Sequence, residues 1–211
     1  GKRVAIIGTG ASAVQVIPEI APIVKQLNVF QRTPIWCFPK PDVPLSARTR
    51  RLMRLPGGPT IQRLLSQAYV ELTFTLPAQY YTVNPMAKNM DKVGKSYLRK
   101  QVDDPEVRDK LTPRYAVGCK RPGFHNTYLS TYNRDNVELV TEPIEKITGS
   151  GVATVDGETR DIDVLILATG FKTMDTDDMP TYPLTGSGGR SWSQHWDENR
   201  SQAYEGVAVP G

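Results

Sequence analysis

The first thirty residues alternate apolar runs with a glycine turn in an order that predicts a βαβ unit. Val4–Ile7 is a continuous apolar run rich in β-branched residues, which is typical of a parallel strand buried on both faces. After the turn, apolar residues recur at helical spacing up to Val24, and the helix is expected to close on Lys25. A second apolar run, Leu27–Phe30, predicts the next parallel strand.

Residues 34–110 do not continue this alternation. Prolines punctuate the first part of the stretch, at positions 34, 39, 41, 44, 56 and 59. Apolar residues recur at helical spacing over 45–55, 60–75 and 87–102. Asp103-Asp104-Pro105 then predicts the start of a short helix that runs to Leu111. We interpret 34–110 as a helical insertion.

The segment after residue 136 consists of short apolar runs separated by turns. Val137–Val140 predicts a strand, and three further β segments follow at 144–148, 152–155 and 159–162. Val164–Leu167 again has the pattern of a buried parallel strand. The predicted fold class is therefore α/β: a Rossmann-like dinucleotide-binding domain with a parallel sheet, a helical insertion and a β-meander.

This pattern divides the chain into two parts. Residues 1–171 are expected to form the nucleotide-binding domain, interrupted by the insertion 34–110. From residue 172 to residue 211 the chain is polar and turn-rich, and it is expected to form a separate segment.

Composition excludes several classes of function. The net charge of +4 is far from that of a dedicated nucleic-acid-binding domain. No run approaches the roughly 18 apolar residues of a membrane helix. An arginine cluster at 48, 50, 51 and 54 suggests a membrane surface, but the short apolar stripe beside it favours a solvated helix face.

The cysteines and histidines do not have the spacing of a metal site. Cys37 and Cys119 are far apart in the sequence and are expected to be reduced thiols of a cytoplasmic protein. His125 and His195 are expected to be structural, and no metal is predicted. The opening Gly1-Lys2-Arg3 leads directly into a strand, which is not the pattern of a signal peptide.

The glycine turn has the pattern G-x-G-x-x-A of a dinucleotide site, with Thr9, Ala11 and Ser12 between its defining residues. Gly8 permits the tight turn, Gly10 lets the backbone approach a pyrophosphate, and Ala13 permits close packing of helix on strand. The N–H groups at the helix start provide a partial positive charge for the phosphates. The strand before the turn and the helix after it support this interpretation.

The end of the second strand favours NADP(H) over NAD(H). NAD sites usually place a carboxylate there to bind the ribose 2′-hydroxyl. This chain instead has Gln31-Arg32-Thr33, and a guanidinium binds a 2′-phosphate through two parallel hydrogen bonds. Thr169 and Gly170 follow the last of the strands predicted to be buried. Ligands of open α/β sheets bind outside the carboxyl ends of the strands, so we expect both residues to face the cofactor cleft there.

Several ordered motifs resemble those of flavin-dependent monooxygenases, most closely the Baeyer–Villiger type. They are the run from Gly1 to Pro18, the segment L-N-V-F-Q-R-T-P ending at Pro34, Lys120-Arg121-Pro122, and Asp163–Phe171 with its A-T-G motif. The family's second glycine fingerprint, for FAD, is absent from this chain. The chain therefore resembles the NADPH-binding portion of such an enzyme.

The resemblance implies a function and a set of roles. NADPH reduces FAD, which is bound mainly by parts absent from this chain, and one oxygen atom of O2 is inserted into a ketone or a soft heteroatom. Arg32 and Lys120 would bind the 2′-phosphate with Thr33 beside them, and Arg121 would be the catalytic cation next to the flavin. The tail would return toward the FAD-binding part, with Trp192 and Trp196 at an interface.

Two alternatives remain open from the sequence. One is the NADP(H)-binding domain of another pyridine-nucleotide flavoprotein, such as a disulfide reductase, which would carry a redox-active cysteine pair. The other is a non-catalytic NADP-binding module.

Overall fold

The computed structural model describes residues 1–40, 42, 44–75, 89–171 and 184–199. The chain forms two compact units, Gly1–Thr169 and Gly170–Gly211. Each unit is described by itself below.

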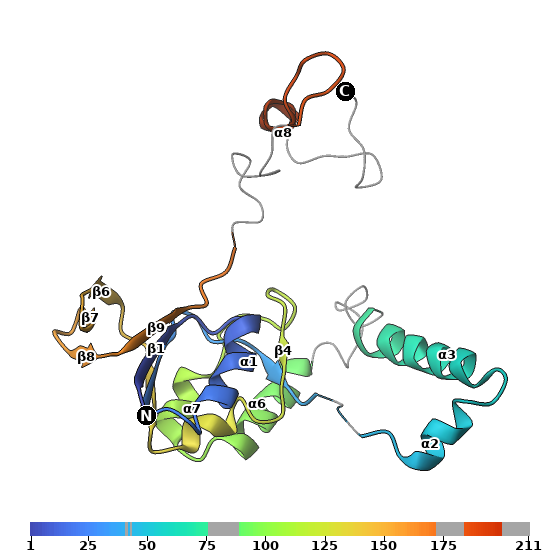
Figure 1. Cartoon of the computed structure of the whole chain (residues 1–211), viewed down its shortest axis with the longest axis horizontal. Helices are drawn as coiled ribbons and strands as arrows, with labels where there is room; N and C mark the ends of the chain where they lie inside the picture. Colours follow the sequence, from blue (N-terminus) through green and yellow to red (C-terminus); the bar gives the residue numbers. More distant parts are fainter. Residues whose placement is uncertain (41, 43, 76–88, 172–183, 200–211) are drawn as a thin grey trace. The chain divides into compact units, whose positions relative to one another are not determined.

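The first unit is built on a four-stranded parallel sheet (Figure 1). Its strands are β1 (Arg3–Ile7), β2 (Gln26–Phe30), β5 (Val137–Val140) and β9 (Val164–Leu167), in the spatial order β5-β2-β1-β9. All three neighbouring pairs are parallel. This order is that of a Rossmann-type sheet, so the predicted fold class is confirmed.

Successive residues of β1 enter different hydrophobic clusters because side chains of a strand alternate between faces. Val4 and Ile6 pack with helix α1 (Ala11–Ile20), whereas Ala5 packs with Phe30 and with Val152 of the β-meander. The cluster on the α1 face also contains Leu98, Val102, Leu111, Tyr128, Leu129 and Tyr132. Strands β1 and β2 are thus covered on both faces, as their continuous apolar runs require. The expectation of a buried strand at 164–167 was wrong in this chain, because β9 is an edge strand whose Val164 and Leu167 are exposed.

Helix α1 is shorter than its apolar pattern predicts. It ends at Ile20, with Ala21 as the C-cap residue, rather than near Lys25. Pro22 explains the difference, because its nitrogen has no hydrogen to donate to the carbonyl of Pro18. The chain then turns directly into β2.

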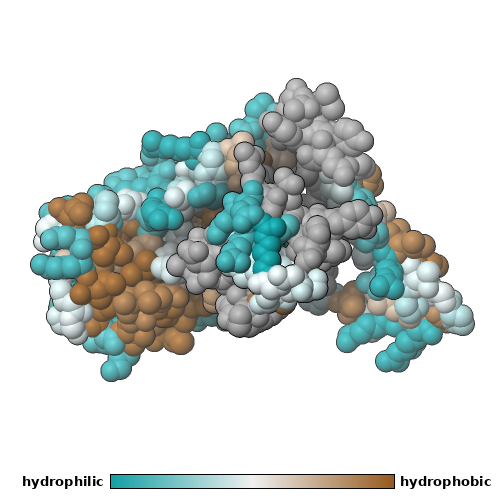
Figure 2. All heavy atoms as spheres, turned by 90° about the horizontal axis from the view of Figure 1, so that it is seen from above, coloured by the Kyte–Doolittle hydropathy of each residue, from teal (hydrophilic) through white to brown (hydrophobic). Residues whose placement is uncertain are grey.

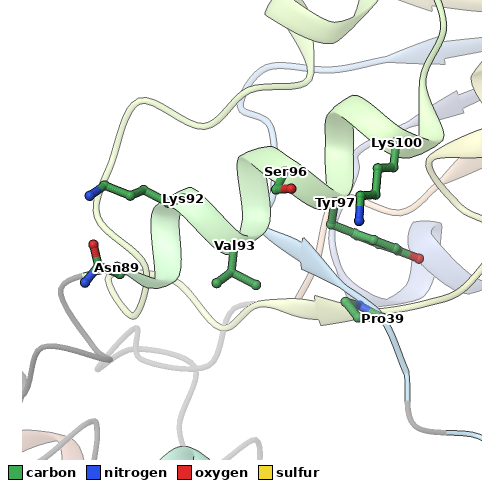
Figure 3. Close-up of a pocket in the computed structure, with 7 residues that line it drawn as sticks. All are labelled: Pro39, Asn89, Lys92, Val93, Ser96, Tyr97 and Lys100. Carbon is green, nitrogen blue, oxygen red and sulfur yellow. The ribbon is translucent and has the colours of Figure 1, made fainter.

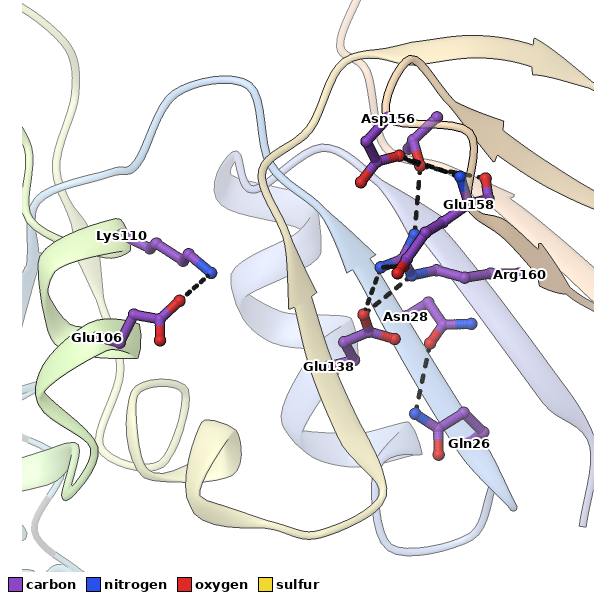
Figure 4. A network of polar contacts seen from close by, with 9 residues as sticks. Gln26, Asn28, Glu106, Lys110, Glu138, Asp156, Glu158 and Arg160 are labelled. Atoms are coloured by element: carbon purple, nitrogen blue, oxygen red, sulfur yellow. Dashed lines mark hydrogen bonds and ion pairs between the residues drawn. The ribbon is translucent and has the colours of Figure 1, made fainter.

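The predicted β-meander is present as an antiparallel sheet of β6 (Ile144–Ile147), β7 (Gly151–Thr154) and β8 (Thr159–Asp161). Arg160 of β8 connects it to the parallel sheet, since its Nη2 lies 2.6 Å from Oε1 of Glu138 in β5 (Figure 4). Thr154 and Glu158 also contact this guanidinium. The half-buried ion pair fixes the meander against the strand edge.

Residues 34–110 are mainly helical in the part of the chain that the structure describes. The helices are α2 (Ala47–Leu52), α3 (Gly58–Val70), the π-helix η1 (Glu71–Thr75), α6 (Met90–Gln101) and α7 (Pro105–Lys110). Asp104 caps α7, accepting hydrogen bonds from the N–H groups of Glu106 and Val107, as its sequence predicted. Positions 87 and 88, where the third helix was expected to start, lie outside the described residues.

A short strand pair between this stretch and a segment that follows it was not anticipated. β3 (Cys37–Phe38) pairs in parallel with β4 (Gly123–Phe124), and a 3-10 helix, η2 (Ser130–Asn133), follows. The pair brings the segment after Arg32 beside the segment after Arg121, although the two are far apart in sequence.

Hydrophobic side chains remain exposed on the first unit. Figure 2 shows a brown area on the side where the sheet and the meander lie. The exposed large hydrophobic residues of these strands and their turns are Ile147, Val155, Val164 and Leu167. A second exposed apolar group lies on α3: Ile61, Leu64, Leu65 and Tyr69. Among the described helices, none combines the length and the hydropathy needed to cross a bilayer.

The second unit contains a helix that we did not predict. α8 runs from Trp192 to Asn199, in a tail expected to be only turn-rich. The sequence feature that marks the start of this helix is a capping box. Ser191 Oγ accepts a hydrogen bond from the N–H of Gln194, and Gln194 Oε1 accepts one from the N–H of Ser191. The rings of Trp192 and Trp196 pack edge to face at 5.0 Å. Their expected place at an interface with the FAD-binding part stays a prediction.

An ion pair at the start of the sheet connects β1 to β9. Asp163 accepts a hydrogen bond from the backbone N–H of Arg3 at 2.7 Å, and Arg3 Nη2 lies 3.0 Å from its Oδ1. The side-chain and backbone hydrogen bonds from Arg3 lower the pKa of Asp163 to about 2. The carboxylate is therefore favoured in the folded chain relative to the unfolded one.

We predict that Asp163→Asn lowers the thermal midpoint of unfolding most above about pH 4, the pKa of an unfolded aspartate. Because the folded pKa is depressed, the contribution of Asp163 is complete above that pH and disappears as the pH falls toward 2. Thermal unfolding of wild type and variant between pH 7 and 2 measures the difference. Asp135→Asn, at an exposed loop position, is the control. A wild-type advantage that stays constant down to pH 2 would contradict the assignment.

Candidate functional site

The candidate site lies at the carboxyl ends of β1, β2 and β9. The chain leaves β1 toward β2 on one side and returns to β9 on the other, so this point is the topological switch of the sheet. Gly8 stands there with a φ of 110°. Its N–H donates to the carbonyl of Phe30 at 3.0 Å. A Cβ at Gly8 would stand 2.3 Å from the carbonyl oxygen of Ala168.

Gly8 therefore brings two predicted motifs together. The G-T-G-A-S-A turn after β1 is in contact with the A-T-G segment after β9 because Gly8 lacks a side chain. Thr169 follows Ala168 and is exposed. Gly170, with a φ of 95°, is the next residue and opens the second unit.

Gly10 differs from Gly8 in its reason for being glycine. Its φ of −77° suits any residue, and a Cβ there would meet nothing within 4 Å. The space in front of it is open, and Ala11 and Ser12 beside it are exposed. Gly10 is also the N-cap of α1 and offers no side-chain cap, so the first N–H groups of the helix point toward this open space. Ala13, in contrast, is fully buried against the sheet.

Arg32 is exposed on a loop whose neighbouring residues are held firmly. Gln31 is buried: its backbone N–H donates to Val140 at 2.8 Å, and its side-chain amide donates to the Lys110 carbonyl at 2.7 Å. The carbonyl of Thr33 accepts from the hydroxyl of Thr9 at 3.1 Å. The end of β2 carries no carboxylate, as the sequence indicates.

Lys120 lies on a second loop that is tied to the first. Its Nζ stands 5.2 Å from the centre of the Tyr115 ring, within cation–π range. The Tyr115 hydroxyl donates to the carbonyl of Pro34 at 2.9 Å, and Trp36 Nε1 donates to the Tyr115 carbonyl at 2.8 Å. Tyr115 thus joins the Lys120 loop to the loop that contains Arg32 and Thr33.

Arg121 is exposed and stands between Lys120 and the start of β4. The backbone N–H of Gly123 donates to the carbonyl of Trp36, which fixes the segment that follows Arg121.

Further along, His125 has the structural role expected of it, because its Nδ1 accepts from the N–H groups of Thr127 and Tyr128. An acceptor at Nδ1 requires the ring to carry no proton there.

The two cysteines are not paired with each other, and Cys119 directly precedes Lys120 of the site. Cys37 is buried and Cys119 exposed, and both are free; burial raises the pKa of the Cys37 thiol to about 11. Within the described ranges, no three His, Cys, Asp or Glu side chains are grouped as metal ligands.

A pocket of about 470 Å³ lies along α6 (Figure 3). None of the predicted site residues lines this pocket. Its lining consists of Pro39, Asn89, Lys92, Val93, Ser96, Tyr97 and Lys100.

Sequence reasoning missed the residues that hold the loops. Tyr115, Trp36 and Gln31 act through hydrogen bonds to main-chain carbonyls about 80 positions away, and no short motif encodes such a partner. Thr9 was predicted only as part of the glycine turn, and its hydroxyl contact with Thr33 was not foreseen.

Known proteins match this chain over its whole length in sequence and in fold. No protein-family model matches the chain. It is 36% identical over 211 residues to a Baeyer–Villiger monooxygenase of Pseudomonas aeruginosa, covering 100% of this chain and 39% of that protein. The chain is homologous to a segment of the Baeyer–Villiger monooxygenases.

Solved structures agree with this relationship. An oxidised steroid monooxygenase bound to NADP superposes with a TM-score of 0.81 and 33% identity, covering 100% of this chain and 46% of that one. OTEMO in complex with FAD and NADP gives a TM-score of 0.76 and 31% identity, covering 94% and 43%. The resemblance deduced from the motifs is confirmed, and this Baeyer–Villiger homologue spans about two fifths of the curated relative's length.

Alanine substitutions at the two glycines of the turn are predicted to lower stability by different amounts. Gly8→Ala should lower stability by about 2 kcal/mol or more, because alanine is strained at positive φ and its Cβ would collide with Ala168. Gly10→Ala should cost less than about 1 kcal/mol, the loss of a tolerated N-cap residue. Chemical denaturation of both variants measures this. Equal losses would show that the contact with Ala168 does not constrain the turn.

Proposed function

We propose that the turn at the carboxyl end of β1 binds the pyrophosphate of NADP(H). The proposal is carried by one observation: the turn has an uncapped helix start and an open space before Gly10, and Thr9 bonds it to the loop of the exposed Arg32. Tyr115 joins that loop to the loop of the exposed Lys120. Helix N–H groups and a close backbone approach are what a pyrophosphate requires. The residues proposed to line this part are Gly8, Thr9, Gly10, Ala11, Ser12, Thr169 and Gly170. Ala13, predicted with them, is fully buried, and we propose that it supports the turn by packing the helix on the strand.

We further propose that Arg32 and Lys120 bind the 2′-phosphate, with Thr33 beside it. Both cations are exposed, and Tyr115 connects their loops. NADH lacks the 2′-phosphate, and no carboxylate follows β2 to bind a free 2′-hydroxyl. These features support selection of NADPH over NADH.

The whole protein is proposed to be a cytoplasmic FAD-dependent monooxygenase that inserts one oxygen atom of O2 into a ketone or a soft heteroatom. Homology to Baeyer–Villiger monooxygenases, and the FAD and NADP of the solved relatives, support this. When bound, NADPH would supply the hydride and FAD would activate O2. This chain would hold and orient the nicotinamide dinucleotide, while FAD would be bound mainly by sequence outside it.

Arg121 is proposed as the catalytic residue. It is an exposed cation next in sequence to Lys120, at the start of a segment fixed by β4. A guanidinium beside the flavin would stabilise negative charge that develops there during oxygen transfer. Lys120 is instead assigned to the adenosine phosphate, since Tyr115 holds it toward the Pro34 loop.

We predict that Arg32→Ala weakens NADPH binding about tenfold and changes NADH binding little. The estimate takes the low end of a charge-assisted hydrogen bond, because Arg32 is exposed. Titration of the protein with each nucleotide measures both affinities. Arg134→Ala, an exposed arginine before the amino end of β5, is the matched control. Equal affinities of wild type for the two nucleotides would overturn the assignment.

Arg121→Ala in the full-length enzyme should abolish product formation while NADPH binding survives. Loss of a residue that stabilises charge present only during the reaction lowers turnover. Loss of a residue that contacts a phosphate in the ground state and the transition state alike mainly raises KM. Product yield and NADPH affinity are compared with those of Lys120→Ala, which should lose affinity. If both variants lose only NADPH affinity and still make product, this division of roles is wrong.

A further inference from the structure

Thr9 occupies an unusual position inside the glycine turn. It lies between Gly8 and the exposed Gly10, yet only 6% of its surface is accessible. Its hydroxyl does not cap α1, since that helix has no side-chain cap. Instead the hydroxyl donates to the Thr33 carbonyl at 3.1 Å. The side chain is therefore directed away from the open space before Gly10 and toward the loop after β2.

The loop that receives this bond is the one that carries Arg32. On its N-terminal side, Gln31 is fixed through Val140 and Lys110. On its C-terminal side, the Thr33 carbonyl is held by Thr9 and the Pro34 carbonyl by Tyr115. The Arg32 side chain is exposed, but its main chain is held on both sides by buried or half-buried partners. Thr9 is the partner that belongs to the pyrophosphate turn.

We propose that Thr9 is a positioning residue that couples the pyrophosphate turn to the cation for the 2′-phosphate. The inference rests on the proposed function, because it assumes that Arg32 meets this phosphate. A bidentate guanidinium–phosphate contact gains most when the loop beneath it is already ordered, since less conformational entropy is then lost on binding. Thr9 thus sets how strongly the site prefers NADPH to NADH, without contacting the 2′-phosphate itself.

A set of hydroxyl-deletion variants tests this in the full-length, FAD-loaded enzyme. Thr9→Val keeps the shape and removes the donor, and Thr9→Ser keeps the donor. We expect Thr9→Val to raise the Kd for NADPH roughly three- to tenfold, the size of one net hydrogen bond, and to leave the Kd for NADH within about twofold. Thr9→Ser should retain the wild-type ratio of the two affinities.

The double variant Thr9→Val/Arg32→Ala distinguishes positioning from a separate contribution. If Thr9 acts through Arg32, the double variant should match Arg32→Ala in NADPH affinity, because its benefit requires the guanidinium. Thr131→Val is the control: Thr131 is also 6% exposed, and its hydroxyl donates to the Thr127 carbonyl. That change should lower the thermal midpoint and leave the nucleotide ratio unchanged.

Several outcomes would overturn the inference. Equal weakening of NADPH and NADH by Thr9→Val would mean that Thr9 only supports the turn. Loss of the NADPH preference in a folded Thr9→Ser protein would mean that the hydroxyl is not what matters, and this test holds even if Thr9→Val does not fold. If Arg32→Ala leaves the ratio unchanged, the proposed role of Arg32 fails first, and that result is read independently of Thr9.

Discussion

The close approach of Gly8 to Ala168 is the constraint on which the site depends. Three parallel strands end at this point, and the turn fits between two of them only because no Cβ separates Gly8 from the Ala168 carbonyl. The N–H of the same residue is satisfied by Phe30. The start of α1, the end of β2 and the A-T-G segment consequently share one small region. The chemistry proposed for the site follows from this juxtaposition of main chain, before any side chain is considered.

The side chains are arranged as exposed charges on internally held loops. Arg32, Lys120 and Arg121 are all accessible to solvent. The residues that hold their loops are buried or half-buried, and each has its polar group at the end of the side chain. Gln31, Trp36 and Tyr115 each donate to a carbonyl in another part of the chain. This division lets a cation keep its hydration until a phosphate arrives, while the loop beneath it has already lost most of its conformational freedom.

The sequence predicted those parts of the molecule that depend on local patterns. The βαβ unit, the meander and the cap of α7 follow from apolar periodicity, glycine turns and Asp104, which act over a few residues. It did not predict the β3–β4 pair or the role of Tyr115, because those contacts join segments more than 80 positions apart with no recurring motif. Apolar spacing alone overestimates the length of α1, which ends before Pro22, and the polar, turn-rich composition of the tail conceals α8, which begins with the capping box at Ser191.

Strand β9 has a consequence for how this chain behaves in concentrated solution. In the described part of the chain it forms one edge of the parallel sheet, and residues 164–171 contain no charged side chain. Leu167 is 66% exposed on it. Edge strands of soluble proteins usually carry lysine, proline or a bulge that prevents another strand from pairing with them. β9 therefore offers unpaired main-chain N–H and C=O groups to which another strand can add, and such an addition would cover Leu167.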